Sequence, residues 1–596
     1  MSYPFSFLDG LNDEQCAAVM RDKNTLVIAG PGSGKTRIVT AKAALELANG
    51  NGVACLSFSN AASDRIRDEL ISMRVPDSDD LFTGTVHDFC LTHIIYPFSP
   101  LFGDRLPENF GIASEKQSVE ILIPLLHEHG ESGKREAEIV SHAEKCLMRL
   151  TSLRRDVVVN GWPSSLENLH RVLLAYDQAM FERGLLDFEM IVQRAIEILR
   201  DSVFLHRYLR HRFAWLLIDE YQDLGGSLHT LAMFIAEKIG MKILAVGDPD
   251  QLIYGFVGAN EVYMYDLLKK GLGFEAAIKT KKCYRFGDRI IATTETILAQ
   301  PRDFSCGREN PGEDQIHFVP LPGGSLSNQT DWIVHDLLPT LQHKLEQRGK
   351  DISRIAILYR SKGPVVNCLR QSLNNPTINR AGLEFVDERI AKLPNSPFIN
   401  WLRQCAGWAI EHTRDLDTFN RFPTLFQDYL KILRDAKRSY SELDQPLIER
   451  EFRSILLKYD DPTFSVQDWI RSFCEGLELY EILDEIGNRT GDLSNLDEIC
   501  QGDVASNCID SVTFGAVKNK AILTTMHSSK GREFDYVILP AISSVEPWGN
   551  PDAATKRLFY VACTRAREAV YITYSERNPS PLVIKMMHVN HMKSEA

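Results

Sequence analysis

Residues 24–36 read NTLVIAGPGSGKT, an apolar run followed by a glycine-rich turn and then by Lys35 and Thr36. The run is short and bounded by turn residues, as a strand buried on both faces of a parallel sheet requires. Residues 36–48 then have the composition of a helix. Strand, glycine turn and helix in this order form the context in which backbone N–H groups surround phosphate oxygens. The stretch therefore predicts an α/β fold with a phosphate-binding loop.

The loop assigns chemistry to particular residues. Lys35 is expected to reach the β- and γ-phosphates of a nucleotide, and Thr36 to ligate Mg²⁺. Ala29 stands where the usual pattern has its first glycine, but the turn glycines Gly32 and Gly34 are kept. The expected nucleotide contacts in this stretch are Ala29, Gly30, Pro31, Gly32, Ser33, Gly34, Lys35, Thr36 and Arg37.

Similar apolar runs recur on the C-terminal side of this loop. One set is GVACLSFS (52–59), FAWLLIDE (213–220) and MKILAVGD (241–248). A second set is SRIAILYR (353–360), KAILTTMH (520–527), DYVILPAI (535–542) and EAVYITY (568–574). Helix-like stretches separate the runs, which predicts two α/β domains with parallel sheets. The regions near 95–190 and 396–505 are charged and helix-like, and we expect them to be helical insertions.

The segment LLIDEYQD (216–223) supplies acids for the same site. An apolar strand that ends in Asp219 and Glu220 places two carboxylates at the carboxyl edge of a parallel sheet, where α/β proteins bind ligands. Asp219 is expected to hold Mg²⁺ through water, and Glu220 to activate the attacking water. A strand that merely ends in solvated acids is the alternative. Together with the phosphate loop, the pair predicts a nucleoside triphosphatase.

Composition and charge exclude several classes of protein. The chain has 596 residues, of which 44% are hydrophobic and 25% charged, as expected for a globular protein of several domains. No apolar run approaches the roughly 20 residues that span a bilayer, and the N-terminus lacks a secretory pattern. Its twelve cysteines form no CxxC pair, which argues against a structural metal site and fits a reduced, cytoplasmic location. The net charge of −13 disfavours a protein that coats DNA but leaves local DNA contacts open.

Further motifs follow in a fixed order, and together they resemble superfamily 1A DNA helicases of the UvrD/Rep/PcrA type. Before the acids stand LNDEQCAAV (11–19), LSFSNAASDRI (56–66), GTVHDFC (84–90) and RGLLDFEMI (183–191). After them come GDPDQLIYGFVGA (247–259), CYRF (283–286), TTMHSSKGREFDYV (524–537) and RLFYVACTRARE (557–568). The ordered set covers nearly the whole chain and is far more specific than any single match.

The resemblance implies roles for these residues. Gln15 would bind the adenine, Tyr284 would stack on it, and Gln251 would sense the γ-phosphate. Arg285 and Arg565 would approach that phosphate from the opposite wall of a cleft, with Arg565 as an arginine finger. Gly531 and Glu533 match further nucleotide contacts. The implied DNA contacts are Phe58, Asn60, Thr85, His87, Phe188, Tyr254, Phe256, Thr525 and His527.

The resemblance also implies an architecture of two RecA-like parallel-sheet domains, each with a mostly helical insertion. The first domain would comprise residues 1–94 and 191–272, with its insertion at 95–190. The second would comprise residues 273–395 and 506–596, with a short insertion at 396–505.

The implied function is an ATP-dependent DNA helicase or translocase that uses Mg²⁺ and moves 3′→5′ on single-stranded DNA or at junctions with duplex. Two alternatives remain open. One is a helicase subunit that serves a partner nuclease in a phage-defence system of the Gabija type, which the short second insertion favours. The other is a nucleotide-gated DNA sensor with little unwinding. The sequence does not distinguish DNA repair from antiviral defence.

Two motifs depart from the family pattern. Phe256-Val257 stands where the family usually has Trp-Arg, so a charge that could couple the nucleotide and DNA sides is missing. Cys283 replaces an amide before Tyr284 and Arg285. We expect these changes to affect regulation and unwinding more than ATP hydrolysis.

Overall fold

The structure is a computed structural model, and its description leaves out a small part of the chain. The residues left out are 1–4, 76–77, 104, 108–109, 130–135, 161–165, 270–271, 299–301, 311, 323–324, 362, 388–395, 412–421, 437, 439–443, 462, 487–491, 502–508, 510–519, 546 and 595–596. The chain divides into two compact units. Unit 1 comprises residues 1–108, 113–324 and 529–596, and unit 2 comprises residues 109–112 and 325–528.

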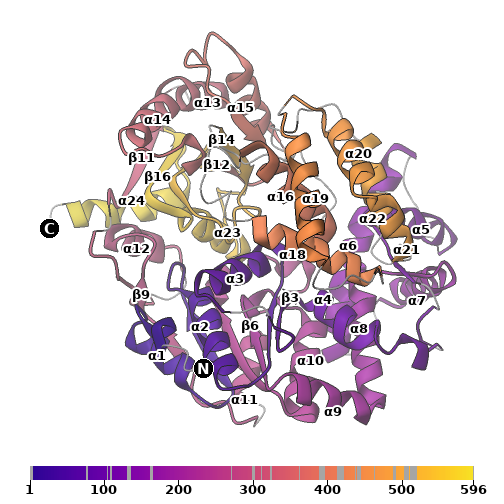
Figure 1. Cartoon of the computed structure of the whole chain (residues 1–596). Coiled ribbons are helices and arrows are strands. Elements are labelled where there is room, and N and C mark those ends of the chain that lie inside the picture. The colour runs from indigo at the N-terminus through magenta and orange to yellow at the C-terminus, as the bar shows by residue number, and fades with distance from the viewer. Residues whose placement is uncertain are drawn as a thin grey trace. The chain divides into compact units, whose positions relative to one another are not determined.

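A six-stranded sheet forms the core of the N-terminal part of unit 1. Its strands, in spatial order, are β3 (Leu81–Thr85), β2 (Val53–Ser57), β6 (Trp215–Ile218), β7 (Lys242–Gly247), β1 (Thr25–Ala29) and β8 (Ile278–Thr280). Every neighbouring pair is parallel, so all the carboxyl ends lie at one edge. Figure 1 shows that indigo and magenta strands, from distant parts of the chain, share this sheet. The predicted α/β fold on parallel strands is confirmed.

Helices connect these strands, as crossovers between parallel strands require. They are α2 (Lys35–Ala48), α3 (Asn60–Ser72), α4 (Val86–Cys90), α8 (Phe188–Asp201), α9 (Val203–Arg212), α10 (Gly226–Phe234) and α11 (Val262–Lys269), while α1 (Asp13–Met20) precedes the first strand. Strands β1, β2 and β6 are buried at every position, which is why their sequences are continuously apolar. The central strands therefore fix where the loops at their carboxyl ends lie.

The main helices of the first predicted helical insertion, in its described residues, are α5 (Glu115–Glu128), α6 (Glu136–Asn160) and α7 (Glu167–Glu182). Two very short strands, β4 (Gly111–Ile112) and β5 (Leu185–Leu186), also lie in the region predicted to be helical. Helix α6 packs against α10 and against the short helix η8 (Gly255–Val257). The insertion therefore contacts the segment that follows strand β7.

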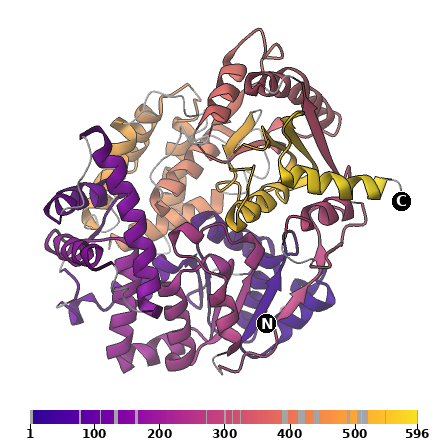
Figure 2. The same cartoon turned by 180° about the vertical axis from the view of Figure 1, so that it is seen from behind.

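A second set of parallel strands comes from the C-terminal half of the chain. In unit 1, β16 (Ala566–Ser575) pairs with β11 (Gln315–Leu321) on one side and with β15 (Phe534–Leu539) on the other. Two further short strands, β9 (Lys282–Cys283) and β10 (Ser305–Cys306), pair with each other. The accompanying helices are α12 (Asp288–Glu295), α23 (Ala553–Cys563) and α24 (Pro581–Ser594). Figure 2 shows α24, in yellow, leading to the C-terminus.

Unit 2 combines parallel strands with a helical cluster. Strand β14 (Ala521–Thr525) pairs with β12 (Ile355–Tyr359) and with β13 (Phe385–Asp387). Helices α13 (Leu326–Trp332), α14 (Leu338–Glu346) and α15 (Pro364–Asn374) accompany these strands. The second predicted insertion contains α16 (Pro397–Glu411), α18 (Phe422–Asp435), α19 (Gln445–Lys458), α20 (Val466–Gly476), α21 (Leu479–Glu485) and α22 (Asp492–Gln501). The domain boundaries expected from the sequence remain a prediction.

Among the described residues, no helix is both long enough and apolar enough to cross a membrane.

The helical cluster of unit 2 has an aromatic centre that makes a testable prediction. The Trp401 ring lies 6.1 Å from those of Tyr429 and Phe452, and its Nε1 donates to the Leu425 carbonyl over 3.0 Å. Replacing Trp401 with Ala should lower the free energy of opening this cluster by about 3–5 kcal/mol. Hydrogen exchange of the α16 amides measures that free energy.

The matched control is Leu447→Ala, because Leu447 is 67% exposed and its truncation leaves no cavity. This control should change the opening free energy by less than about 0.5 kcal/mol. Equal exchange rates in the two variants would contradict an aromatic core at Trp401.

Candidate active site

The phosphate-binding loop joins strand β1 to helix α2. Gly32 and Gly34 have φ angles of +68° and +79°, a region that glycine enters without the steric penalty of a Cβ. Ser33 closes the turn, since its hydroxyl donates to the Gly30 carbonyl over 2.8 Å. Lys35 then begins α2, so the free N–H groups of the helix start lie at the loop. The loop has the geometry that the sequence predicts.

The two acids after strand β6 lie beside this loop. The Thr36 hydroxyl donates to Asp219 Oδ2 over 3.0 Å, and Lys35 Nζ lies 3.7 Å from Glu220 Oε1. Strand β7 separates β6 from β1 in the sheet, yet all three strands end at the same edge. The structure therefore brings together the lysine, the hydroxyl and both acids predicted from the sequence.

The charges of this cluster act on each acid differently. Burial raises the pKa of the Asp219 carboxyl, and the negative charge of Glu220 raises it further. Burial acts on Glu220 as well, but the positive charges of Lys35 and Lys530 outweigh it and lower the pKa of that carboxyl. Glu220 is therefore ionised at neutral pH, which is the form that a general base needs.

Glu220 also has an unusual backbone. Its φ is +53°, in the left-handed region that residues other than glycine rarely adopt. Gln222 stabilises the turn, since its Nε2 donates to Glu220 Oε2 over 2.5 Å and its Oε1 accepts from the Asp248 N–H over 2.9 Å. The turn after β6 is thereby joined to the turn after β7, its neighbouring strand in the sheet. Strain of this kind concentrates at functional sites.

Gln251 connects the acid side of the site to the C-terminal part of the chain. Its amide nitrogen donates to Asp248 Oδ2 over 2.7 Å, and its amide oxygen accepts from Arg565 Nη2 over 3.1 Å. Arg565 is 1% exposed, and its Nε donates to the Val561 carbonyl. Burial, together with the charge of Arg285, lowers the pKa of Arg565. The predicted γ-phosphate sensor and the predicted arginine finger are thus in direct contact.

Arg285 lies against the phosphate loop. A Cβ added to Gly32 would come within 2.5 Å of Arg285 Cβ, so only glycine permits this approach. Arg285 donates to the Thr564 carbonyl over 2.8 Å and forms an ion pair of 2.7 Å with Glu533, while its buried Nε has no hydrogen-bond partner among the described residues. A buried guanidinium with an unused donor beside a glycine loop fits a phosphate group.

Other predicted nucleotide contacts have protein partners in this structure. Glu533 also pairs with Arg567 over 3.3 Å, and the Gly531 carbonyl accepts from the Arg65 guanidinium. Arg37 Nη1 lies 3.6 Å from the Glu69 carboxylate, on helix α3. Their nucleotide contacts remain predictions.

The predicted adenine contacts gather around Asn12. The Gln15 side chain accepts from the Asn12 N–H over 2.9 Å and donates to the Ser33 carbonyl over 2.8 Å, so it fixes the start of α1 to the phosphate loop. Asn12 Nδ2 donates to the Tyr284 hydroxyl over 2.9 Å. The structure therefore brings Gln15 and Tyr284 to one end of the loop, where a base joined to bound phosphates could lie.

The sequence interpretation missed Lys530. Its Nζ donates to both carboxylate oxygens of Asp223, over 2.7 and 2.6 Å, and to the Gln251 carbonyl over 2.8 Å. The same ammonium lies 5.3 Å from the centre of the Tyr254 ring. Asp223 and Lys530 both belong to motifs quoted above, but a single sequence gives no sign that these two positions are in contact.

Several predicted DNA contacts form a cluster of rings. The Phe58 and Tyr254 rings lie 5.8 Å apart, and those of Tyr254 and Phe256 lie 6.2 Å apart. We call these three residues the aromatic track. Phe256 is 57% exposed, so its ring is available to a ligand. Tyr254 stands three residues after Gln251, so these rings lie close to the predicted phosphate sensor.

The remaining predicted DNA contacts have separate positions. The His87 and Phe188 rings lie 5.1 Å apart, and Phe188 is 49% exposed. Thr85 caps helix α4, because its hydroxyl accepts from the Asp88 N–H. In unit 2, the Thr525 hydroxyl donates to Ser528 Oγ over 2.8 Å, and His527 follows strand β14. The Asn60 side chain lies outside the described part of the chain.

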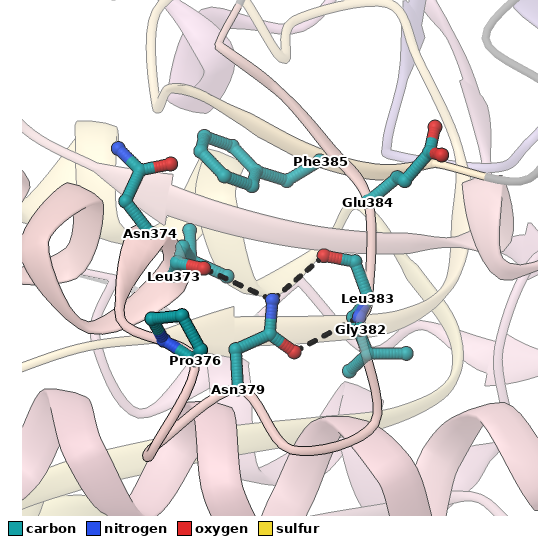
Figure 3. Close-up of a pocket in the computed structure, with 8 residues that line it drawn as sticks. All are labelled: Leu373, Asn374, Pro376, Asn379, Gly382, Leu383, Glu384 and Phe385. Atoms are coloured by element: carbon teal, nitrogen blue, oxygen red, sulfur yellow. Dashed lines mark hydrogen bonds between the residues drawn. The ribbon is translucent and has the colours of Figure 1, made fainter.

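An open hollow in unit 2 belongs to a different part of the protein. Figure 3 shows Asn379 among its lining residues, bonded to the Leu373 and Leu383 carbonyls and to the Leu383 N–H. The Asn379 amide therefore holds the loop together, and Glu384 at the rim lies 3.4 Å from Lys520. The hollow contains none of the predicted nucleotide or DNA contacts.

Comparison with known proteins shows that the chain is similar to DNA helicases. Residues 11–270 match the UvrD/REP helicase N-terminal domain, and residues 416–577 match the UvrD-like helicase C-terminal domain. The ATP-dependent DNA helicase PcrA of Staphylococcus aureus (strain MRSA252) is 22% identical over 96% of this chain and 84% of its own length. PcrA of Staphylococcus epidermidis (strain ATCC 12228 / FDA PCI 1200) is 23% identical over 95% of this chain and 84% of its own length.

The contact between Gly32 and Arg285 makes a prediction. Gly32→Ala should weaken nucleotide binding at least about tenfold, because its methyl group would push apart the loop and the Arg285 stem. Gly50→Ala is the matched control, since Gly50 has a φ of +78° but open space around its Cβ position. Both variants incur left-handed strain of about 1–2 kcal/mol. Titration with a fluorescent ATP analogue measures the difference, and equal affinities of the two variants would contradict the prediction.

Proposed function

This chain belongs to the UvrD/Rep/PcrA type of superfamily 1 helicases, and we propose that it is an ATP-dependent DNA helicase. We propose further that it moves 3′→5′ along single-stranded DNA. The observation that carries the proposal is the direct contact between Gln251 and Arg565 beside the cluster of Lys35, Asp219 and Glu220. This contact joins an acid-bearing site to an arginine from a distant part of the chain.

The residues present fit a magnesium nucleotide. Thr36 and Asp219 supply two oxygen atoms of the kind that Mg²⁺ prefers, and Lys35 supplies a cation for the phosphates. A bound Mg²⁺ would neutralise charge on the phosphate oxygens. It would also favour the ionised form of the buried Asp219 carboxyl. We therefore assign Thr36 and Asp219 as the magnesium-binding pair.

In the proposed chemistry, the side of the site that carries Glu220 and the side that carries Arg285 and Arg565 have different roles. Glu220 accepts the proton of the water that attacks the γ-phosphate. Arg285 and Arg565 approach from the other wall and stabilise the charge that develops on the phosphate oxygens. Because Gln251 binds Arg565 directly, a group placed between them would alter the position of both. This is how the state of the nucleotide can change the distance between the walls.

The aromatic track supports binding of single-stranded DNA without sequence preference. Every base has a π-face, so rings such as Phe58, Tyr254 and Phe256 stack on any sequence. Tyr254 and Phe256 follow Gln251 in the chain, and Lys530 contacts both Gln251 and Tyr254. Movement at the nucleotide can therefore reach the rings that hold the strand, which supports translocation. The direction of movement is inferred from the family.

Glu220→Gln tests the assignment of the general base. Glutamine keeps the shape of the side chain but cannot accept the proton, so kcat for ATP hydrolysis should fall by about 10²–10⁴ while ATP binding is retained. Glu275→Gln is the control, because Glu275 is an exposed partner of Lys23. A steady-state ATPase assay with the control near the wild-type rate makes the comparison. Near-normal turnover of Glu220→Gln would remove Glu220 from this role.

Strand displacement tests the motor itself. ATP hydrolysis should rise strongly when single-stranded DNA is added, and the protein should unwind a 3′-tailed duplex faster than a 5′-tailed or blunt one. Equal hydrolysis with and without DNA would contradict a DNA motor. Stimulated hydrolysis without displacement would identify a translocase that does not unwind, and preference for the 5′-tailed duplex would reverse the proposed polarity.

A further inference from the structure

Arg155, on helix α6 of the helical insertion, is a buried charge for which the proposed mechanism has no use. It is 6% exposed, and its Nε donates to Glu189 Oε1 over 2.5 Å. Its Nη1 donates to the Val257 carbonyl over 2.6 Å. Burying a guanidinium and a carboxylate is costly unless both are fully paired. The guanidinium therefore has two fixed partners, one on α8 and one in the turn that carries Phe256.

The stem of Arg155 also lies between two segments that come from the nucleotide site. A Cβ on Gly225 would lie 2.5 Å from Arg155 Cδ, and one on Gly258 would lie 3.2 Å from Arg155 Cβ. Gly225 follows the turn of Glu220 and Asp223, and the bridge between Gly225 and Ala259 pairs that segment with the end of the track segment. The two glycines leave the space that the arginine stem fills.

One ring predicted to contact DNA lies near the same guanidinium. The carbon at its centre lies 5.8 Å from the centre of the Phe58 ring. Burial, followed by the charge of Arg155, lowers the pKa of His87 to about 4, so this imidazole is neutral at pH 7. His87 in turn lies against the ring of Phe188. Arg155 thus lies beside the Phe58 ring and favours the neutral form of His87.

We infer that Arg155 is a positioning residue, which holds Phe58 and the turn of Phe256 in the geometry that stacks bases. The inference rests on the proposed function, since it concerns the grip on single-stranded DNA. It gives the helical insertion a direct part in that grip, because helix α6 carries the guanidinium. The hydrogen bonds of Arg155 go to Glu189 and to the Val257 carbonyl, so its effect is on the geometry of the turn and of the rings beside it.

The neighbouring Arg154 is a matched control. It is 3% exposed, stands on the same helix and pairs with Asp177 and Asp187, and it lies 5.3 Å from the Tyr176 ring. Asp177, Asp187 and Tyr176, its partners within the described part of the chain, lie outside the aromatic track and outside residues 247–260. Arg154→Gln therefore removes a similarly buried cation from α6 without releasing the track.

The experiment compares Arg155→Gln with Arg154→Gln in the full chain. For Arg155→Gln, the concentration of oligo(dT) that gives half-maximal ATPase stimulation should rise about tenfold, within the range for losing one stacked base. The rate at saturating oligo(dT) should change less than twofold. An oligonucleotide labelled with 2-aminopurine, whose fluorescence reports base stacking, should show a smaller change on binding. Arg154→Gln should differ from wild type less than twofold in all three measurements.

Three outcomes would overturn the inference. They are equal shifts in the two variants, no shift in Arg155→Gln, and a loss confined to the saturated rate. If Arg155→Gln does not fold, the same comparison uses R155Q/E189Q, which leaves no unpaired carboxylate; failure of both to fold would make Arg155 a purely structural residue. A wild-type ATPase that ignores DNA would instead reject the proposed function.

Discussion

The buried ion pair between Lys530 and Asp223 is the contact on which the arrangement of the site depends. The two side chains are 7% and 4% exposed, and such charges are stable in the interior only when they are fully paired. Lys530 satisfies both oxygens of the acid and also binds the Gln251 carbonyl. One ammonium thereby fixes the turns after β6 and β7 to a residue 307 positions further along the chain. The contact between Gln251 and Arg565 requires those turns to be held in place.

The sequence predicted the parts of the site that consist of consecutive residues. The phosphate loop and the pair Asp219-Glu220 follow from local patterns, because a buried strand and a glycine turn constrain each position. The parallel order of the strands then places the two groups at one edge, which the structure confirms. What the sequence did not predict are pairings across long separations, such as Arg155 with Val257 and Lys530 with Asp223. One chain read alone carries no signal for which buried charges meet.

Gln15 has contacts that the resemblance to the family does not predict. The family pattern assigns it to adenine, whereas the structure shows its amide bonded to Asn12 and Ser33. These bonds hold helix α1 against the phosphate loop, so the residue has a structural part whether or not it also contacts a base. The left-handed backbone of Glu220 could not be predicted from the sequence either, because its φ angle depends on the geometry of the turn and on the contact with Gln222.

The structure gives Val257 a role that its side chain does not suggest. Its side chain lacks the charge that the family usually has, but its carbonyl accepts a hydrogen bond from the guanidinium of Arg155. The charge near this turn therefore comes from the helical insertion, with Glu189 as its counterion. The charge that is missing from position 257 is thus replaced at this turn by one that helix α6 carries.

The left-handed backbone of Glu220 has a consequence for the evolution of the chain. Such a conformation costs on the order of 1–3 kcal/mol for a residue with a side chain, and Gly or Asn would relieve much of it. Selection for stability alone would therefore replace this acid. In a duplicate of the chain released from the need to hydrolyse ATP, position 220 is among the first where we expect Gly or Asn to accumulate. The residue at position 220 of each such duplicate would then indicate whether that protein still hydrolyses ATP.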